Sequence, residues 1–465
     1  MPSAGLGGVG PQAAGVQHGF MCDGGGSPTK VAAILPRPAE GTAVDPIALE
    51  AVDEVVITTL VDNSYDALMG DIGPARRTPF PAVASILAPQ FEEGRTYPGL
   101  IAEHGFSALV TTRRGATAHT VLFDTGVSPD GMASNFERLG LDVAAIEVVV
   151  LSHGHADHDG GFPGLARLRG RSGLPLTVHP LVWSRRRFAL PDQAPWELPT
   201  LSRSALEAEG LEVIERRQPS LLLNGSILIT GEVDRTTEFE RGLPSHEAWR
   251  NGRWEPDPLI LDEQALVVHV RGRGLVVLTG CGHAGAVNIA RHAMRLTGVD
   301  RLHALLGGFH LTGPAFEPVI EPTVAAVVDM APDVLVPAHC TGGRLSIGLP
   351  RRCPPHSCRT RSARPSPWPD PGSRLALVPT NRQPRCAGAA TVIDRKTLAC
   401  KQFRLDAAGP ARVPTAMPGT RLVADEDFAW AERVFRQRVG GWVIHFPRVV
   451  GTRSANRAPS LCLHK

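Results

Sequence analysis

Residues 151–161, which read LSHGHADHDGG, constrain this chain of 465 residues more than any other segment. Three histidines and two aspartates lie within seven positions, directly after an apolar stretch at 146–151. A buried strand that ends in this cluster would place several imidazole groups and a carboxylate at one edge of a sheet. Nitrogen and oxygen ligands held close together suit Zn²⁺, Fe²⁺ or Mn²⁺, and two ions can share such a site. The segment therefore predicts a metal site.

The same segment resembles the HxHxDH motif of the metallo-β-lactamase superfamily. Asp124, in the upstream LFDTG, resembles an aspartate that braces the metal-site loop in that superfamily. Further apolar strands that run into loops with glycine or histidine carry the resemblance at 279–285 (TGCGHAG), 306–311 (LGGFHL) and 336–342 (VPAHCTG). Together with VDN at 61–63 and EHGFS at 103–107, they resemble one branch in particular. That branch includes the archaeal dihydropterin–ribofuranosylaminobenzene phosphate synthase family and bacterial metal-dependent hydrolases.

The resemblance implies an α/β fold of the αββα sandwich type. Apolar runs predict strands near 55–61, 107–110, 120–123 and 148–151, and the spacing over 287–296 predicts a helix packed on a sheet. We expect four segments along the chain: a disordered leader at 1–45, a metallo-β-lactamase-like domain at 46–343, a low-order Pro/Arg-rich segment at 344–419, and a tail of uncertain fold at 420–465.

The Pro/Arg-rich segment departs from the family. Residues 344–385 hold nine prolines, nine arginines and one acidic residue, with no sustained helical or strand period. Two interpretations stay open, a disordered segment and the product of a reading-frame shift. Residues 420–447 recover an amphipathic pattern that would suit a short helix.

The resemblance assigns metal ligands within the motif. His153 and His155 match the pair that binds the first metal, and Asp157 and His158 match the pair that binds the second. Residues i and i+2 of an extended segment point to the same side, so the first two histidines can reach one ion. Asp157 is also the predicted catalytic residue.

The other ligands lie further along the chain. His283, in a glycine-flanked loop, is predicted as the third ligand of the first metal, and His339 as the last ligand of the second. Asp124 is expected to accept a hydrogen bond from a ligating histidine rather than to bind metal, and Asp159 either to do the same or to cap the loop.

The bridging acid of the superfamily has no obvious counterpart. Cys281, His310 and Glu232 each stay open as substitutes. Four other histidines are expected to be ordinary core or surface residues: His179, His246, His269 and His292.

Composition favours an enzyme with a small substrate. The net charge of +2 gives no general attraction to nucleic acid or membranes, and no apolar run approaches the roughly 20 residues of a membrane span. The first 20 residues lack a secretion signal, and eight scattered cysteines do not form a disulfide framework. We therefore expect a cytoplasmic protein that takes a small molecule, phosphorylated or not, and has no nucleic-acid or membrane partner.

Two divalent ions, with zinc expected and iron or manganese as alternatives, would provide a metal-bound hydroxide near neutral pH. This predicts a hydrolase for an ester, amide or phosphoester. Two other functions stay open: a transferase that condenses a pterin-methyl diphosphate with an aminobenzene ribofuranosyl phosphate, and a metal-binding protein without turnover. His104 is a candidate to line the pocket. Candidates to bind phosphate are Arg235, Arg241 and the run Arg185, Arg186 and Arg187.

Overall fold

The computed structural model describes residues 31–34, 45–68, 70–77, 85–342, 391–392, 401–407, 434–439 and 442–447. The chain divides into two compact units, Met1–Ala408 and Gly409–Lys465. In the second unit the described residues form an antiparallel hairpin of β23 (Val434–Val439) and β24 (Trp442–Pro447). The expected helix is therefore a strand at these positions, where β-branched and aromatic residues favour extended backbone.

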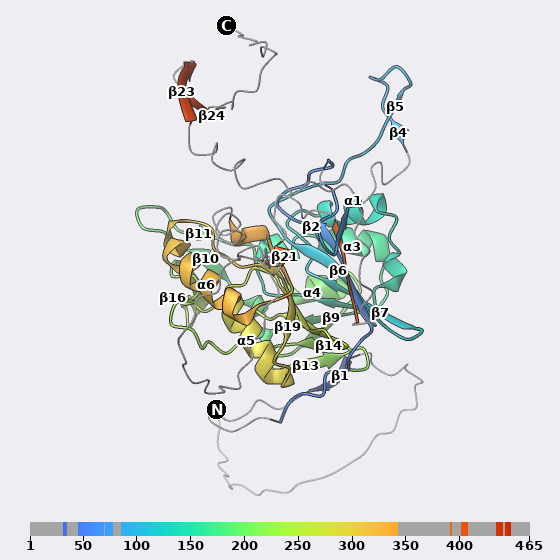
Figure 1. Cartoon of the computed structure of the whole chain (residues 1–465), viewed down its shortest axis with the longest axis vertical. Coiled ribbons are helices and arrows are strands. Elements are labelled where there is room, and N and C mark those ends of the chain that lie inside the picture. The colour runs from blue at the N-terminus through green and yellow to red at the C-terminus, as the bar shows by residue number, and fades with distance from the viewer. Residues whose placement is uncertain are drawn as a thin grey trace, which may run out of the picture. The chain divides into compact units, whose positions relative to one another are not determined.

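Two eight-stranded sheets form the first unit (Figure 1). The first sheet carries the HxHxDH segment. Its first four strands in the order below pair in parallel, and the remaining neighbours pair antiparallel. Its strands, in spatial order, are β12 (Leu211–Glu215), β9 (Leu174–Val178), β8 (Val148–Val150), β7 (Thr117–Phe123), β6 (Ser107–Arg114), β2 (Glu54–Val61), β22 (Lys401–Asp406) and β3 (Ala75–Arg77).

The second sheet has the same mixed character, with its parallel strands at the end that carries the later motifs. Its strands, in spatial order, are β1 (Val31–Ile34), β13 (Ser220–Leu222), β14 (Ile227–Ile229), β17 (Leu266–Val270), β18 (Gly274–Thr279), β19 (Leu302–Gly308), β20 (Val334–Ala338) and β21 (Thr391–Val392).

Helices cover the outer face of each sheet. α1 (Gly131–Arg138) and α3 (Phe162–Arg169) pack on the first sheet, and α5 (Ala286–Thr297) and α6 (Glu317–Met330) on the second (Figure 1). β18 explains the layering: Val276 and Leu278 face the core between the sheets, whereas Leu275 and Val277 face α5. Because side chains alternate along a strand, an all-apolar strand must be covered on both faces. The predicted αββα sandwich is confirmed.

Smaller elements surround the sandwich. A four-stranded sheet near the site has the order β11 (Trp196–Glu197), β10 (Arg186–Phe188), β15 (His246–Arg250) and β16 (Arg253–Pro256). The other short elements are β4 (Ile86–Leu87), β5 (Arg95–Thr96), α2 (Ala156–Asp159), α4 (Arg203–Ala208) and the 3₁₀ turns η1 (Val143–Ala145), η2 (Pro180–Trp183), η3 (Pro314–Phe316) and η4 (His339–Thr341). No described helix is long and apolar enough to cross a membrane.

The sandwich extends past the predicted limit at residue 343. β22 pairs with β2 and β3, and its residues Phe403 and Leu405 are buried between the sheets. Polar and apolar residues alternate in KQFRLD, as they do in a half-buried strand. The composition of the wider segment obscures this alternation. The low-order segment predicted for 344–419 is thus corrected at β21 and β22. The disordered leader predicted for 1–45 is likewise corrected at β1, which pairs with β13 in the second sheet. The rest of the leader up to residue 44, most of 343–400 and the question of a frame shift lie outside the described residues.

Candidate metal centre

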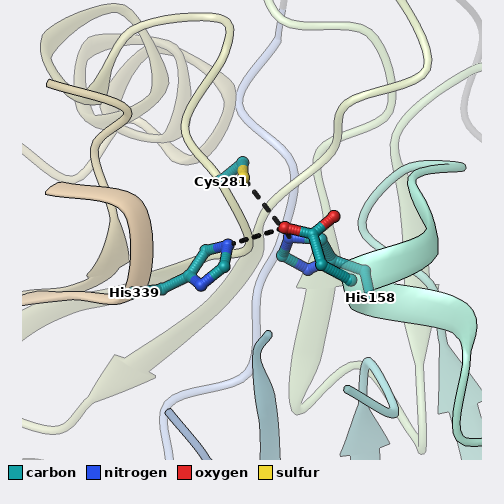
Figure 2. Close-up of side chains that lie close together, drawn as sticks. His158, Cys281 and His339 are labelled. Carbon is teal, nitrogen blue, oxygen red and sulfur yellow. Dashed lines mark hydrogen bonds and ion pairs between the residues drawn. The ribbon is translucent and has the colours of Figure 1, made fainter. Parts of the chain in front are cut away.

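Loops at one edge of the two sheets bring the predicted ligands together. The HxHxDH segment follows β8, the loop with Cys281 and His283 follows β18, and His339 follows β20. These are parallel strands of their sheets, whose carboxyl ends meet at a common edge. Figure 2 shows His158, Cys281 and His339 turned toward one another from three separate parts of the ribbon.

Three histidines form one side of the site. Nε2 of His153 lies 3.0 Å from Nδ1 of His155, and the ring of His283 lies 4.9 and 5.0 Å from theirs, centroid to centroid. Both ring nitrogens of His283 are buried without a hydrogen-bond partner among the described residues. Burial lowers the pKa of all three rings well below its usual value. Neutral imidazoles with unused lone pairs are what a divalent cation binds.

Asp157, His158 and His339 form the other side. Oδ2 of Asp157 lies 3.2 Å from Nε2 of His339 and 3.7 Å from Nε2 of His158. Burial disfavours the charged forms of both Asp157 and His158. Even so, His158 and His339 hold the pKa of Asp157 well below its usual range. Asp157 and Asp124 in turn raise the pKa of His158 to about 9. A proton on His158 thus balances the carboxylates, and a bound cation could take its place.

Cys281 lies between the two sides. Its Sγ lies in two groups of ligand atoms, and within each group all atoms are within 4.8 Å of one another. One group also contains His153 and His283, and the other contains Asp157, His158 and His339. His158 Nε2 is 3.3 Å from this sulfur. Of the three substitutes considered for the bridging acid, Cys281 is the one in both groups.

The other two substitutes lie elsewhere. His310 groups with Cys281 and Cys340 and with none of the other predicted ligands. Glu232 pairs with Arg217 at 2.7 Å and with His179 at 3.3 Å, and it belongs to no ligand group among the described residues. Glu232 therefore has a structural role.

Asp124 fixes two of the histidines. It follows β7 with a φ of 58°, a left-handed conformation that is costly for aspartate, and it is fully buried. Its Oδ2 accepts hydrogen bonds from Nδ1 of His158 and Oγ of Ser152, both at 2.7 Å. Since the Ser152 hydroxyl donates to Asp124, it accepts from Nδ1 of His153 at 3.0 Å. Both histidines are left with Nε2 facing the centre.

Asp159 is also buried. Burial raises the pKa of Asp159 to about 8, so its carboxyl is largely protonated at neutral pH. It forms no hydrogen bond with a ligating histidine among the described residues. Asp159 lies in the short helix α2 and belongs to no group of ligand atoms among the described residues.

His246 was not predicted to take part in the site. This buried residue of β15 has its Nε2 3.0 Å from Nε2 of His155, and its Nδ1 lies 3.0 Å from the carbonyl oxygen of Asp257. No motif marks it, since it is 91 positions from His155. His179, His269 and His292 lie outside the ligand groups, as expected.

A second unpredicted feature is the run Asp262–Glu263–Gln264 before β17. Asp262 accepts from the backbone N–H of Gly154 at 2.8 Å, and Gln264 donates to the carbonyl oxygen of Leu151 at 2.9 Å. Glu263 accepts from the backbone N–H groups of Gly282, at 2.5 Å, and Ala284. Three consecutive side chains thus tie the HxHxDH loop and the His283 loop together. Burial raises the pKa of Glu263 to about 7.

Most of the predicted phosphate ligands are engaged elsewhere. Arg186 forms a buried ion pair with Asp262, and Arg185 and Arg187 pair with Glu197 and Glu247. Arg235 donates to backbone carbonyls, one of them that of His283. The remaining candidate is Arg241, an exposed residue that donates from Nε to the carbonyl oxygen of Glu238.

His104 lies at the rim of the site. Its exposed ring has Nε2 3.6 Å from Oδ2 of Asp157 and is stacked at an angle on His339, 5.1 Å away. His104 therefore lies beside two of the predicted ligands. The whole donor set of imidazoles, one ionised carboxylate and one thiol fits divalent ions that accept nitrogen and sulfur ligands.

Comparisons with known proteins show which proteins the chain is similar to. The family model of the metallo-β-lactamase superfamily matches residues 102–184. A 7,8-dihydropterin-6-methyl-4-(β-D-ribofuranosyl)aminobenzene-5'-phosphate synthase of Methanocaldococcus jannaschii is 28% identical over 247 residues, 52% of this chain and 81% of the relative. A solved structure described as a metal-dependent hydrolase of the β-lactamase superfamily is 26% identical, with a TM-score of 0.46, over 64% of this chain and 92% of that one. The chain is thus similar to members of the metallo-β-lactamase superfamily.

Proposed function

We propose that the chain is a metal-dependent hydrolase that acts on an ester, amide or phosphoester. The observation that carries the proposal is the convergence of buried ligand atoms around Cys281 on two sides. Two divalent ions would be held, one by His153, His155 and His283, the other by Asp157, His158 and His339. When bound, such ions lower the pKa of water toward about 7 and polarise a carbonyl or phosphoryl oxygen.

Asp157 is the proposed catalytic residue. Its pKa is held well below the usual range, so the carboxylate can accept a hydrogen bond from the attacking water. His104, 3.6 Å from the same carboxylate oxygen and exposed, is placed to pass a proton to solvent. His339 orients Asp157 from the buried side.

Cys281 would take the shared position that a carboxylate occupies in the common pattern. Its thiol is buried and its pKa is raised by that burial, so a cation would have to displace the proton. Thiolate and imidazole ligands favour zinc or iron over magnesium. We expect zinc.

A transferase is the second candidate. The relative that is 28% identical over 81% of its length is named as a synthase that joins a pterin to an aminobenzene ribofuranosyl phosphate. In that reaction the same donor set would hold ions against a diphosphate leaving group, and no water would attack.

The test uses the full chain, freed of metal and reloaded with Zn²⁺. Hydrolysis of 4-nitrophenyl acetate, bis(4-nitrophenyl) phosphate and a simple lactone is measured beside condensation of a pterin-methyl diphosphate. The proposal expects hydrolysis of at least one compound, reduced about 100-fold or more in Asp157→Asn. Condensation without hydrolysis would establish the transferase, and metal binding with neither reaction would reject both.

A further inference from the structure

A pocket of about 640 Å³, partly open to solvent, adjoins the metal centre. It lies between the loop 239–244, the start of α5 and the start of α6, and His283 and His310 form its inner end. Its walls are mainly apolar, with Phe239, Leu311 and Phe316 among them. His310 stacks edge-on against Phe316, 4.8 Å between centroids, so the aromatic wall continues to the metal ligands.

Polar groups mark the two ends of this pocket. At the inner end, Nδ1 of His310 is buried and has no hydrogen-bond partner among the described residues. Toward solvent the lining includes Arg241. In the described part of the chain, the other four arginines proposed to bind phosphate are paired with a carboxylate or buried against backbone carbonyls, and Arg241 is neither.

Glu240 also lines the pocket, yet it does not cancel the charge of Arg241. Its two carboxylate oxygens accept hydrogen bonds from the backbone N–H groups of Val287, at 2.9 Å, and Asn288, at 2.8 Å. These are first-turn residues of α5, so the positive end of the helix offsets this carboxylate. The free charge of the pocket is therefore positive.

We propose that this pocket binds an aromatic group of the substrate and that Arg241 pairs with an anionic substituent on that group. The reacting bond would then lie beyond His310, next to the ions. The substrate class is an anionic aromatic ester, amide or phosphoester. This inference rests on the proposed function for the position of the reacting bond, but the binding of the anionic ring can be measured without turnover.

The test measures dissociation constants on the zinc-loaded full chain by calorimetry with three probes. 2-Naphthalenesulfonate has the ring and the charge and is a poor metal ligand, methyl 2-naphthyl sulfone has the ring alone, and methanesulfonate the charge alone. We expect the sulfonate to bind about tenfold or more tightly than the sulfone, because a charge-assisted hydrogen bond is lost in the sulfone. Methanesulfonate should bind more weakly than either.

Matched variants assign the effect to the pocket. Arg241→Gln should weaken the sulfonate to the level of the sulfone, whereas Arg185→Gln, whose arginine already pairs with Glu197, should not change it. Phe316→Ala should weaken both ring probes several-fold, and Phe91→Ala, an exposed ring outside the pocket, neither. Equal binding of sulfonate and sulfone, or unchanged binding in Arg241→Gln, would overturn the inference.

The two proposals fail separately. If the probes bind as expected but no ester or phosphoester is turned over, hydrolysis is rejected and the pocket assignment stands. If 4-nitrophenyl acetate is hydrolysed and the sulfonate does not bind, the pocket assignment alone is rejected.

Discussion

His246 determines which nitrogen of His155 is available to a metal. The carbonyl oxygen of Asp257 can only accept, so Nδ1 of a neutral His246 carries the proton and its Nε2 accepts. His155 must then donate from Nε2, which leaves the lone pair of its Nδ1 facing His153. The small sheet that carries β15 thereby contributes to the metal site without a ligand of its own.

Replacing His246 should therefore weaken metal binding. We expect His246→Ala to raise the dissociation constant of the ion next to His155 about 10- to 100-fold, the range seen when partners of ligating histidines are lost. Competition with a chromogenic chelator measures it. His269→Ala, at a histidine outside the site, is the control. Unchanged affinity in His246→Ala would show that His155 needs no such partner.

The two buried thiols make a matched pair. Sγ of Cys281 lies 3.4 Å from Sγ of Cys340, but only Cys281 shares a group with both sides of the site. In the cobalt-substituted protein we expect near-ultraviolet thiolate-to-cobalt absorption that is lost in Cys281→Ser and kept in Cys340→Ser. Absorption that survives Cys281→Ser would exclude Cys281 as a ligand.

At the scale of elements, the run 262–264 joins the ends of β8 and β18. Glu263 is buried with its pKa raised to about 7, against 4.5 for an unperturbed glutamate. Between these two values the folded chain holds a proton that the unfolded chain releases, so the free energy of unfolding falls as pH rises. The difference amounts to at most about 3 kcal/mol.

Glu263→Gln should flatten this slope. In urea unfolding of the metal-free proteins, we expect the wild type to lose stability between pH 4.5 and 7 and Glu263→Gln to lose less. At low pH the variant should be the less stable protein, because its amide cannot accept hydrogen bonds from both backbone N–H groups. Glu255→Gln, on β16 and paired with Arg253, is the control and should keep the slope. An identical slope in Glu263→Gln would exclude Glu263 as its source.

The motifs that resemble the superfamily, more than the periodicity of the strands, predicted the sandwich. They did not predict His246 or the run 262–264, whose roles come from contacts between segments about 20 to 110 residues apart. The contacts of Arg185, Arg186 and Arg187 were equally invisible, since their partners lie in other strands and loops.

At the scale of the molecule, the first sheet depends on a strand that is remote in sequence. β22 lies between β2 and β3, more than 300 residues from β2, and Phe403 is 1% exposed in the core between the sheets. A composition-based limit at residue 343 could not include it, because the six residues of the strand are a small part of a Pro/Arg-rich stretch.

Removing the Phe403 ring should destabilise the whole sandwich. We expect Phe403→Ala to lower the free energy of unfolding by about 3–5 kcal/mol, the usual cost of a buried phenylalanine. Gln402→Ala, at an exposed position of the same strand, should change it by less than about 0.5 kcal/mol. Chemical unfolding followed by tryptophan fluorescence compares them, and equal stabilities would mean that β22 does not hold the sheet.

The metal content of the purified full chain tests the central claim most directly. Loaded with zinc, dialysed and analysed by inductively coupled plasma mass spectrometry, the wild type should hold about two ions per chain. His153→Ala and His339→Ala, which alter opposite sides of the site, should each hold about one. A wild type that holds no stoichiometric metal, or a content unaffected by either substitution, would contradict the account.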